Sequence, residues 1–197
     1  MVVLHQCHDP RHDGVPRLAT VRACDPLDVL KEHPGIKLIS LEKNLGTVGA
    51  INNGILQNRS DYLLFLSAND ILDLNFVESF KTSDWTYYPG VWSALAKKFK
   101  NSPLKTKPVC SPIVSMKNGY FPPADCAKLF RRYLNWFTGT TSCFHRATII
   151  ESGCLEERLG GIADWLLAVV LCFRSGCYFS PNYLCRIRIH GPGYLSK

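Results

Sequence analysis

The feature that most constrains the fold is residues 36–68, where two apolar segments flank a glycine-containing turn and a helical pattern. The first segment, IKLISL, is rich in β-branched and apolar residues, and the second, DYLLFLSA, is an almost continuous apolar run. Between them, Val48, Ile51 and Ile55 fall at helical spacing over residues 47–58. A continuous apolar strand is typical of a sheet covered on both faces. The order strand, helix, strand predicts a right-handed crossover unit.

This arrangement also predicts where chemistry should be sought. In open α/β sheets, ligands bind at the carboxyl ends of the strands. Residues 42–46 follow the first predicted strand and residues 67–70 follow the second. We therefore expect these two segments to lie side by side at one edge of the sheet.

The rest of the chain alternates between shorter elements. The sequence predicts an N-terminal strand over residues 2–7 and a helix over 25–32, which Asp25 would cap before Pro26. Further helices are predicted over residues 73–81, 92–100, 124–134, 147–153 and 164–176, and further strands over 108–116, 140–146, 177–181 and 183–190.

Length and composition are those of an ordinary globular protein. The chain has 197 residues, of which 46% are hydrophobic and 20% charged, and this length suits one domain. Its longest apolar run, residues 165–173, is too short to span a bilayer, and residues 1–24 show no apolar signal-peptide core. We therefore expect a cytoplasmic location. The 9 scattered cysteines predict reduced, mostly buried thiols.

The formal net charge is +7, and part of it lies in the lysine-rich residues 97–107. Such a segment could face nucleic acid or an anionic membrane, or it could be a solvated loop and helix end. The solvated loop is favoured and no nucleic-acid partner is expected, because no nucleic-acid motif accompanies the segment. A basic face would also suit an anionic donor such as a nucleotide diphosphate.

The turn and helix carry a family resemblance. The spacing N-x-G-x-x-x-A-x-N-x-G is met in full by Asn44, Gly46, Ala50, Asn52 and Gly54, and DYLLFLSANDIL follows. This pattern resembles the GT-A glycosyltransferases of family 2. In that family the same helix precedes a strand that ends in an acidic metal motif of the D-A-D-D type.

A second segment, residues 143–184, resembles the acceptor side of the same family. There, a strand and an R-x-x-x-x-x-x-G-x-x-x-E-x-L stretch lead to an aspartate that opens a long helix. The resemblance covers roughly residues 26–190. It implies an α/β fold of the GT-A (Rossmann-like) type, with a mixed, mostly parallel sheet flanked by helices.

The same resemblance implies a division of the chain. Residues 25–197 would form one GT-A-like domain, with the donor side over about 25–83 and the acceptor side over about 84–197. Residues 1–24 would be a degenerate or incomplete N-terminal part of the nucleotide-binding half. There, Asp9 would stand in for the acidic residue that grips the nucleoside.

On the acceptor side, the resemblance places three residues near the chemistry. Asp164 matches the general base, at the start of a helix whose dipole favours the carboxylate, although it could also merely cap that helix. Trp165 would line the acceptor pocket or pack in the core. His190 would lie near the diphosphate or metal, or be a simple surface histidine.

On the donor side, Asn44 and Gly46 would shape the turn under the nucleotide. Asn52 would either contact the ligand or hold the turn by hydrogen bonds to the backbone. Ser67, Asn69 and Asp70 complete the predicted donor-binding set.

The acidic motif departs from the family pattern. Its positions read Ser67, Ala68, Asn69 and Asp70, so the metal-ligand position falls most nearly on Asn69. An amide oxygen can bind Mg²⁺ or Mn²⁺ but brings no charge, and Asp70 could compensate. The predicted metal set is therefore Asn69, Asp70 and His190.

Three interpretations follow. The leading one is an inverting glycosyltransferase that moves a sugar from a nucleotide donor, a UDP-sugar by family habit, to a saccharide or lipid-linked acceptor. A membrane-associated acceptor would add peripheral contact with a membrane. The second is a non-catalytic or incomplete relative with a weak nucleotide site. The third is a basic nucleic-acid-binding protein, whose affinity would collapse with salt.

Overall fold

The structure is a computed structural model that describes residues 2–6, 35, 37–67, 69–109, 112–134, 136–137 and 139–189. The chain divides into two compact units, Met1–Arg59 and Ser60–Lys197. The helix predicted over residues 25–32 lies outside the described residues.

The first unit contains a parallel strand pair and one helix. β1 (Val2–Gln6) pairs with β2 (Lys37–Leu41), in register from Val2 opposite Lys37 to Gln6 opposite Leu41. Helix α2 (Gly46–Gln57) follows and buries Ala50, which joins Ile39 and Leu41 in a small apolar core. These elements confirm the predicted strand, turn and helix to within one or two residues.

The second unit is built on a seven-stranded sheet in the order β3-β8-β5-β9-β4, with β6 beside β5 and β7 beside β9. The strands are β3 (Tyr62–Leu64), β4 (Ile71–Leu72), β5 (Val91–Phe99), β6 (Lys107–Pro108), β7 (Gly119–Phe121), β8 (Ser142–His145) and β9 (Cys177–Arg188).

The mixed α/β class is as predicted, but the balance of strand directions differs. Within this sheet β5 and β9 are parallel, while the other described pairings are antiparallel. The expectation of a mostly parallel sheet is therefore wrong for the described strands. Strand β8 runs against both of its neighbours, β3 and β5, and β4, β6 and β7 each run against the strand with which they pair.

The helix predicted over residues 92–100 is also wrong, because these residues lie in β5. Residues 91–96 are all buried, between β8 on one side and β9 on the other. The Ala, Leu and Lys content favours a helix locally, but a central strand covered on both faces overrides that preference.

Proline accounts for two further differences at the strands. Among the described residues of the strand predicted over 108–116, only Pro108 lies in a strand. Pro112, within the same range, has no backbone N–H to donate to a neighbouring strand. The two predicted C-terminal strands form one strand, β9, whose register with β5 shifts opposite Leu95. Pro181 lies in β9 at this shift, as is usual for a bulge.

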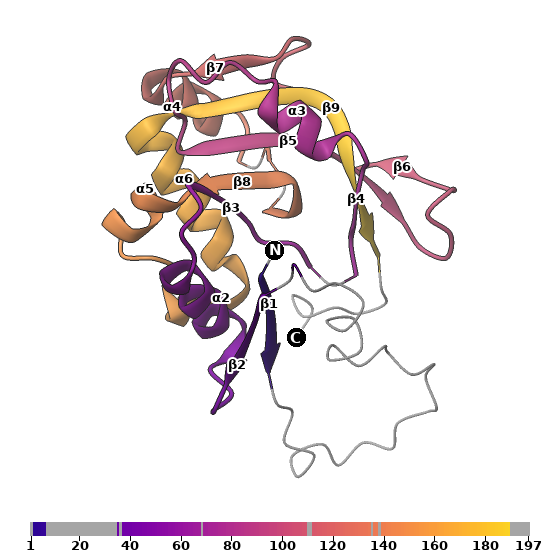
Figure 1. The fold of residues 1–197 in the computed structure, drawn as a ribbon. Coiled ribbons are helices and arrows are strands. Elements are labelled where there is room, and N and C mark those ends of the chain that lie inside the picture. Colours follow the sequence, from indigo (N-terminus) through magenta and orange to yellow (C-terminus); the bar gives the residue numbers. More distant parts are fainter. Residues whose placement is uncertain are drawn as a thin grey trace. The chain divides into compact units, whose positions relative to one another are not determined.

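The helices of the second unit are α3 (Phe76–Lys81), α4 (Pro123–Arg132), α5 (Arg146–Glu151) and α6 (Ala163–Ser175), with 3-10 turns η2 (Gly139–Thr141) and η3 (Glu157–Ile162). Helix α6 contacts both α4 and α5 (Figure 1). No helix among the described residues is both long and apolar enough to cross a bilayer.

The core of the second unit is aromatic. Phe76, Trp92 and Tyr178 are buried together with Ala94, Cys143 and Leu184. All six described cysteines are free, and five of them are buried, as predicted for reduced structural thiols.

Candidate active site

The turn between β2 and α2 is closed by a side chain. Asn44 Oδ1 accepts a hydrogen bond of 2.9 Å from the backbone N–H of Gly46. Gly46 has a φ of 68°, a left-handed conformation that glycine adopts without strain. Asn52 lies half-buried within α2. The geometry explains why this turn needs asparagine and glycine, while nucleotide contact by Asn44, Gly46 and Asn52 remains a prediction.

In the second unit, Ser67, Asn69 and Asp70 lie in the connection between β3 and β4. The backbone N–H of Asp70 donates a hydrogen bond of 3.0 Å to the carbonyl oxygen of Ser67. Ser67 and Asn69 are exposed, whereas Asp70 is half-buried. Because residues 42–46 belong to the other unit, the expected adjacency of the two turns remains a prediction.

The carboxylate of Asp70 is fixed by contacts from two distant parts of the chain. Its Oδ2 accepts a hydrogen bond of 2.8 Å from Thr140 Oγ1. Its Oδ1 accepts one of 3.0 Å from the backbone N–H of Arg188 at the end of β9. Hydrogen bonds to an ionised acceptor are strong, so these two contacts hold the carboxylate in one orientation.

Asp164 occupies the first turn of α6. Its Oδ1 accepts a hydrogen bond of 2.8 Å from the backbone N–H of Trp165. Burial raises the pKa of the Asp164 carboxyl above its ordinary value of 3.8, while hydrogen bonds from the Trp165 and Asp164 N–H groups oppose that rise. The carboxylate is therefore partly desolvated, which strengthens it as a proton acceptor.

The turn η2 touches both carboxylates. A Cβ added at Gly139 would lie 2.6 Å from Asp164 Oδ2, so only glycine allows this close approach. The next residue, Thr140, holds Asp70, and Thr141 Oγ1 donates 2.7 Å to the carbonyl oxygen of Ala94 in β5. One three-residue turn anchored on the sheet thus contacts both a candidate base, Asp164, and a candidate metal ligand, Asp70.

The oxygen atoms of Asn69 and Asp70 suit a hard divalent cation that binds together with a diphosphate. Asp70 offers carboxylate oxygens and Asn69 offers an exposed amide oxygen. No group of three or more His, Cys, Asp or Glu side chains that could hold a metal is found within the part of the chain that the structure describes. Mg²⁺ is usually held by one or two carboxylates plus substrate phosphates, so the set suits a cation that arrives with a diphosphate.

Two other predicted residues differ in how far they can be placed. Trp165 is half-buried beside Asp164, and its contact with an acceptor remains a prediction. His190 lies outside the described residues.

Sequence reasoning missed Gly139 and Thr140. The signal was the short run TGTT at residues 138–141, where glycine between threonines suggests a turn. Nothing local to that run shows that Asp70 and Asp164 lie against it, because both contacts come from elements distant in sequence.

The mixed sheet with its helices is an α/β fold of the GT-A type. The chain belongs to glycosyl transferase family 2, because the sequence model of that family matches residues 19–136. No curated protein matches the chain.

Solved structures with the same fold include residues 1–349 of S. aureus TarS in complex with UDP-GlcNAc. It superposes with a TM-score of 0.68 at 12% identity, covering 88% of this chain and 49% of TarS 1–349. GalNAc-T7 with UDP, GalNAc and Mn²⁺ superposes with a TM-score of 0.57 at 12% identity, covering 85% of this chain and 35% of that one. The chain therefore spans half or less of the length of these two solved chains.

Proposed function

We propose that the chain transfers a sugar from a UDP-sugar to a hydroxyl of a saccharide or lipid-linked acceptor, with inversion at the anomeric carbon. The observation that carries the proposal is that Asp70 and Asp164 both contact the turn η2. The bound nucleotides of TarS and GalNAc-T7 support the choice of donor class.

In this proposal Asp164 is the general base. The acceptor O–H gives its proton to the Asp164 carboxylate as the oxygen attacks the anomeric carbon. The bond from that carbon to the diphosphate oxygen breaks, and the electron pair leaves with the diphosphate. One base and one displacement give inversion. Trp165, next to the base, would line the acceptor site.

The proposed donor-binding residues of the first unit are Asn44, Gly46 and Asn52, which would lie under the nucleotide. In the second unit, Ser67 would be a donor-binding residue. This assignment keeps the donor side over about residues 25–83 and the acceptor side over about 84–197.

Asn69, Asp70 and His190 would hold Mg²⁺ or Mn²⁺. The cation would neutralise charge on the leaving diphosphate. The Thr140 hydroxyl and the Arg188 N–H hold the Asp70 carboxylate in one orientation. The fixed carboxylate would in turn orient the diphosphate.

We also propose that the protein is cytoplasmic and contacts a membrane peripherally through the β5–β6 hairpin. This hairpin carries five lysines and no acidic residue over residues 97–107, and Leu104 near its tip is 88% exposed. Each basic residue near an anionic bilayer contributes about 1 kcal/mol of attraction. A lipid-linked acceptor would be reached from this position.

A non-catalytic relative with a weak nucleotide site is the second candidate. It is favoured by Ser67 and Asn69, which stand where the family pattern has acids. The two candidate functions differ in one measurable respect: the enzyme turns over a nucleotide sugar, and the non-catalytic relative only binds the nucleotide.

The test is release of UDP from a panel of UDP-sugars, with and without Mn²⁺ and with mixed oligosaccharides or membrane extract as acceptor. The proposal predicts Mn²⁺-stimulated UDP release from at least one donor. Nucleotide binding without release from any donor would establish the non-catalytic candidate instead.

A further inference from the structure

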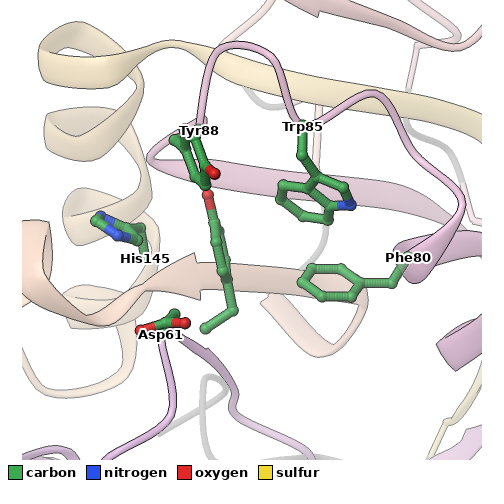
Figure 2. A pocket seen from close by; sticks show the side chains of 6 residues that line it. Asp61, Phe80, Trp85, Tyr88 and His145 are labelled. Atoms are coloured by element: carbon green, nitrogen blue, oxygen red, sulfur yellow. The ribbon is translucent and has the colours of Figure 1, made fainter.

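A pocket of about 430 Å³ opens in the second unit away from the two acids. It is lined by Asp61, Tyr62, Phe80, Trp85, Tyr88 and His145 (Figure 2). Its volume lies in the range of about 300–1,000 Å³ that small-molecule sites occupy. Its lining comes from the start of β3, the end of β8, helix α3 and the loop before β5.

This pocket and the candidate active site lie at opposite ends of the β3–β8 ladder. Tyr62 pairs with His145 at the pocket end, and Leu64 pairs with Cys143 towards the other end. The turn η2, which contacts both acids, immediately precedes β8. His145 lies four residue steps along the chain from Thr141, roughly 13 Å at the usual rise of a strand. A molecule in the pocket therefore does not occupy the place of the reacting sugar.

The walls of the pocket are aromatic and mutually supported. Tyr62 packs against Phe80, Trp85 and His145 with ring-centroid distances of 5.5, 5.0 and 5.2 Å. The Tyr62 hydroxyl donates 2.7 Å to the carbonyl oxygen of Pro89, and burial raises the pKa of Tyr62, so this donor stays protonated. The rings therefore form a fixed platform.

Two polar groups complete the lining. His145 Nδ1 lies 2.8 Å from Thr148 Oγ1, which leaves Nε2 as the ring nitrogen available to a ligand. The Asp61 side chain is exposed at the mouth, and no hydrogen bond or ion pair to its carboxylate is found among the described residues. In Figure 2, Phe80 and Trp85 lie on one side of the pocket, with Asp61 and His145 on the other.

Tyr88 is held in an unfavourable conformation at the rim. Its φ is 42°, which bulky residues rarely adopt, and its side chain is 66% exposed. An exposed ring contributes little packing energy to offset the cost of its strained backbone. Strained residues of this kind cluster at ligand-binding positions.

We propose that this pocket is a second, non-catalytic binding site for a neutral saccharide. A pyranose ring presents an apolar C–H face that stacks on Trp85 and Tyr88, and hydroxyls that donate to the Asp61 carboxylate and bond to His145. The Asp61 carboxylate repels phosphate, so the pocket favours a neutral ligand over the nucleotide donor. The choice of saccharide as ligand class rests on the proposed function, in which a glycan is the acceptor and the pocket holds sugar units remote from the reacting hydroxyl.

The test is saturation-transfer NMR and calorimetric titration of the full chain with neutral trisaccharides: maltotriose, cellotriose and tri-N-acetylchitotriose. Tyr88→Gly removes the rim ring and relieves the left-handed backbone, so the variant keeps its fold. Asp61→Asn removes the charge while keeping the shape. Tyr87→Ala is the matched control, because Tyr87 is an exposed neighbour (61%) that does not line the pocket.

The proposal predicts saturable binding of at least one trisaccharide, weakened at least fivefold in Tyr88→Gly and Asp61→Asn, kept in Tyr87→Ala, and unaffected by saturating UDP. Absence of binding to the parent, binding that Tyr88→Gly leaves unchanged, or competition by UDP would overturn it. Self-association that Tyr88→Gly abolishes, without saccharide binding, would assign the surface to a second copy instead. Saccharide binding without UDP release would refute only the proposed function, whereas UDP release without saccharide binding would refute only this site.

Discussion

At the scale of single residues, Asp164 is subject to opposing effects. Burial raises the pKa of its carboxyl, while the Trp165 N–H and the start of α6 favour the charged form. A desolvated carboxylate held by one short hydrogen bond is suited to accept a proton without moving.

Replacing Asp164 by asparagine tests this role. Asp164→Asn keeps an oxygen that accepts from the Trp165 N–H but cannot take a proton, so kcat for transfer should fall by about 10²–10⁴-fold. UDP affinity should not change. Turnover retained within threefold of the parent would remove Asp164 from the mechanism.

The same substitution makes a prediction about stability. Since the pKa of Asp164 is raised in the fold, its ionised form costs stability above that pKa, and the cost disappears as pH falls through it. The melting temperature of Asp164→Asn should therefore be equal to or above that of the parent at pH 7. The difference should vanish below pH 3.8, the ordinary value. Thermal unfolding monitored by circular dichroism at the two pH values measures it, and a lower melting temperature at pH 7 would contradict it.

Single-residue roles differed in how far sequence could predict them. The position of Asp164 at a helix start was predictable, because the apolar pattern of residues 164–176 and Gly176 bound that helix locally. The role of Thr140 was not, because its partner Asp70 is 70 residues away in the sequence.

At the scale of elements, η2 is the piece on which the candidate site depends. It contacts Asp164 through Gly139, Asp70 through Thr140 and β5 through Thr141. A displacement of this turn should move both carboxylates together.

Gly139→Ala tests the element directly. The new Cβ would lie 2.6 Å from Asp164 Oδ2, so the carboxylate must shift, and a displacement of about 1 Å can cost about 100-fold in rate. We expect kcat for UDP release to fall on that scale while the circular dichroism spectrum is unchanged. Gly119→Ala is the control, since its Cβ would meet nothing within 4 Å. Equal activity of both variants would show that Gly139 does not position the base.

Elements were predictable where local pattern and tertiary context agree. Helix α6 and strand β8 were found from their apolar runs and flanking residues. Strand β5 was not, because its Ala and Lys content favours a helix and only its place between β8 and β9 makes it a strand. The antiparallel direction of β8 likewise depends on long-range pairing that no local pattern encodes.

At the scale of the whole molecule, much of the net positive charge of +7 comes from one segment, residues 97–107. Residues 97–107 of the β5–β6 hairpin carry five lysines and no acidic residue. Arg186 Nη1 donates a hydrogen bond of 3.4 Å to the carbonyl oxygen of Pro103, which ties the hairpin loop to β9. A tied basic loop with exposed Leu104 forms a defined surface.

The hairpin predicts binding to anionic vesicles. The parent should co-sediment with vesicles of 30% phosphatidylserine and 70% phosphatidylcholine, and not with phosphatidylcholine alone. Lys105→Glu combined with Lys107→Glu should lose at least about tenfold in affinity, because each lysine contributes about 1 kcal/mol. The control, Lys81→Glu with Arg131→Glu, changes the net charge equally elsewhere. Equal loss in both double variants would mean that net charge, not the hairpin, drives the binding.

The central claim is that this chain binds a nucleotide diphosphate with a divalent cation at Asp70. The most direct measurement is calorimetric titration of the protein with UDP, with and without Mn²⁺, for the parent, Asp70→Ala and Asp125→Ala. Asp125 is a surface control whose pairing with Lys128 contributes little to stability. We predict UDP binding at least about tenfold tighter with Mn²⁺, equivalent to about 1.4 kcal/mol, lost in Asp70→Ala and kept in Asp125→Ala. UDP binding absent under both conditions, or equal in the parent and Asp70→Ala, would contradict the account.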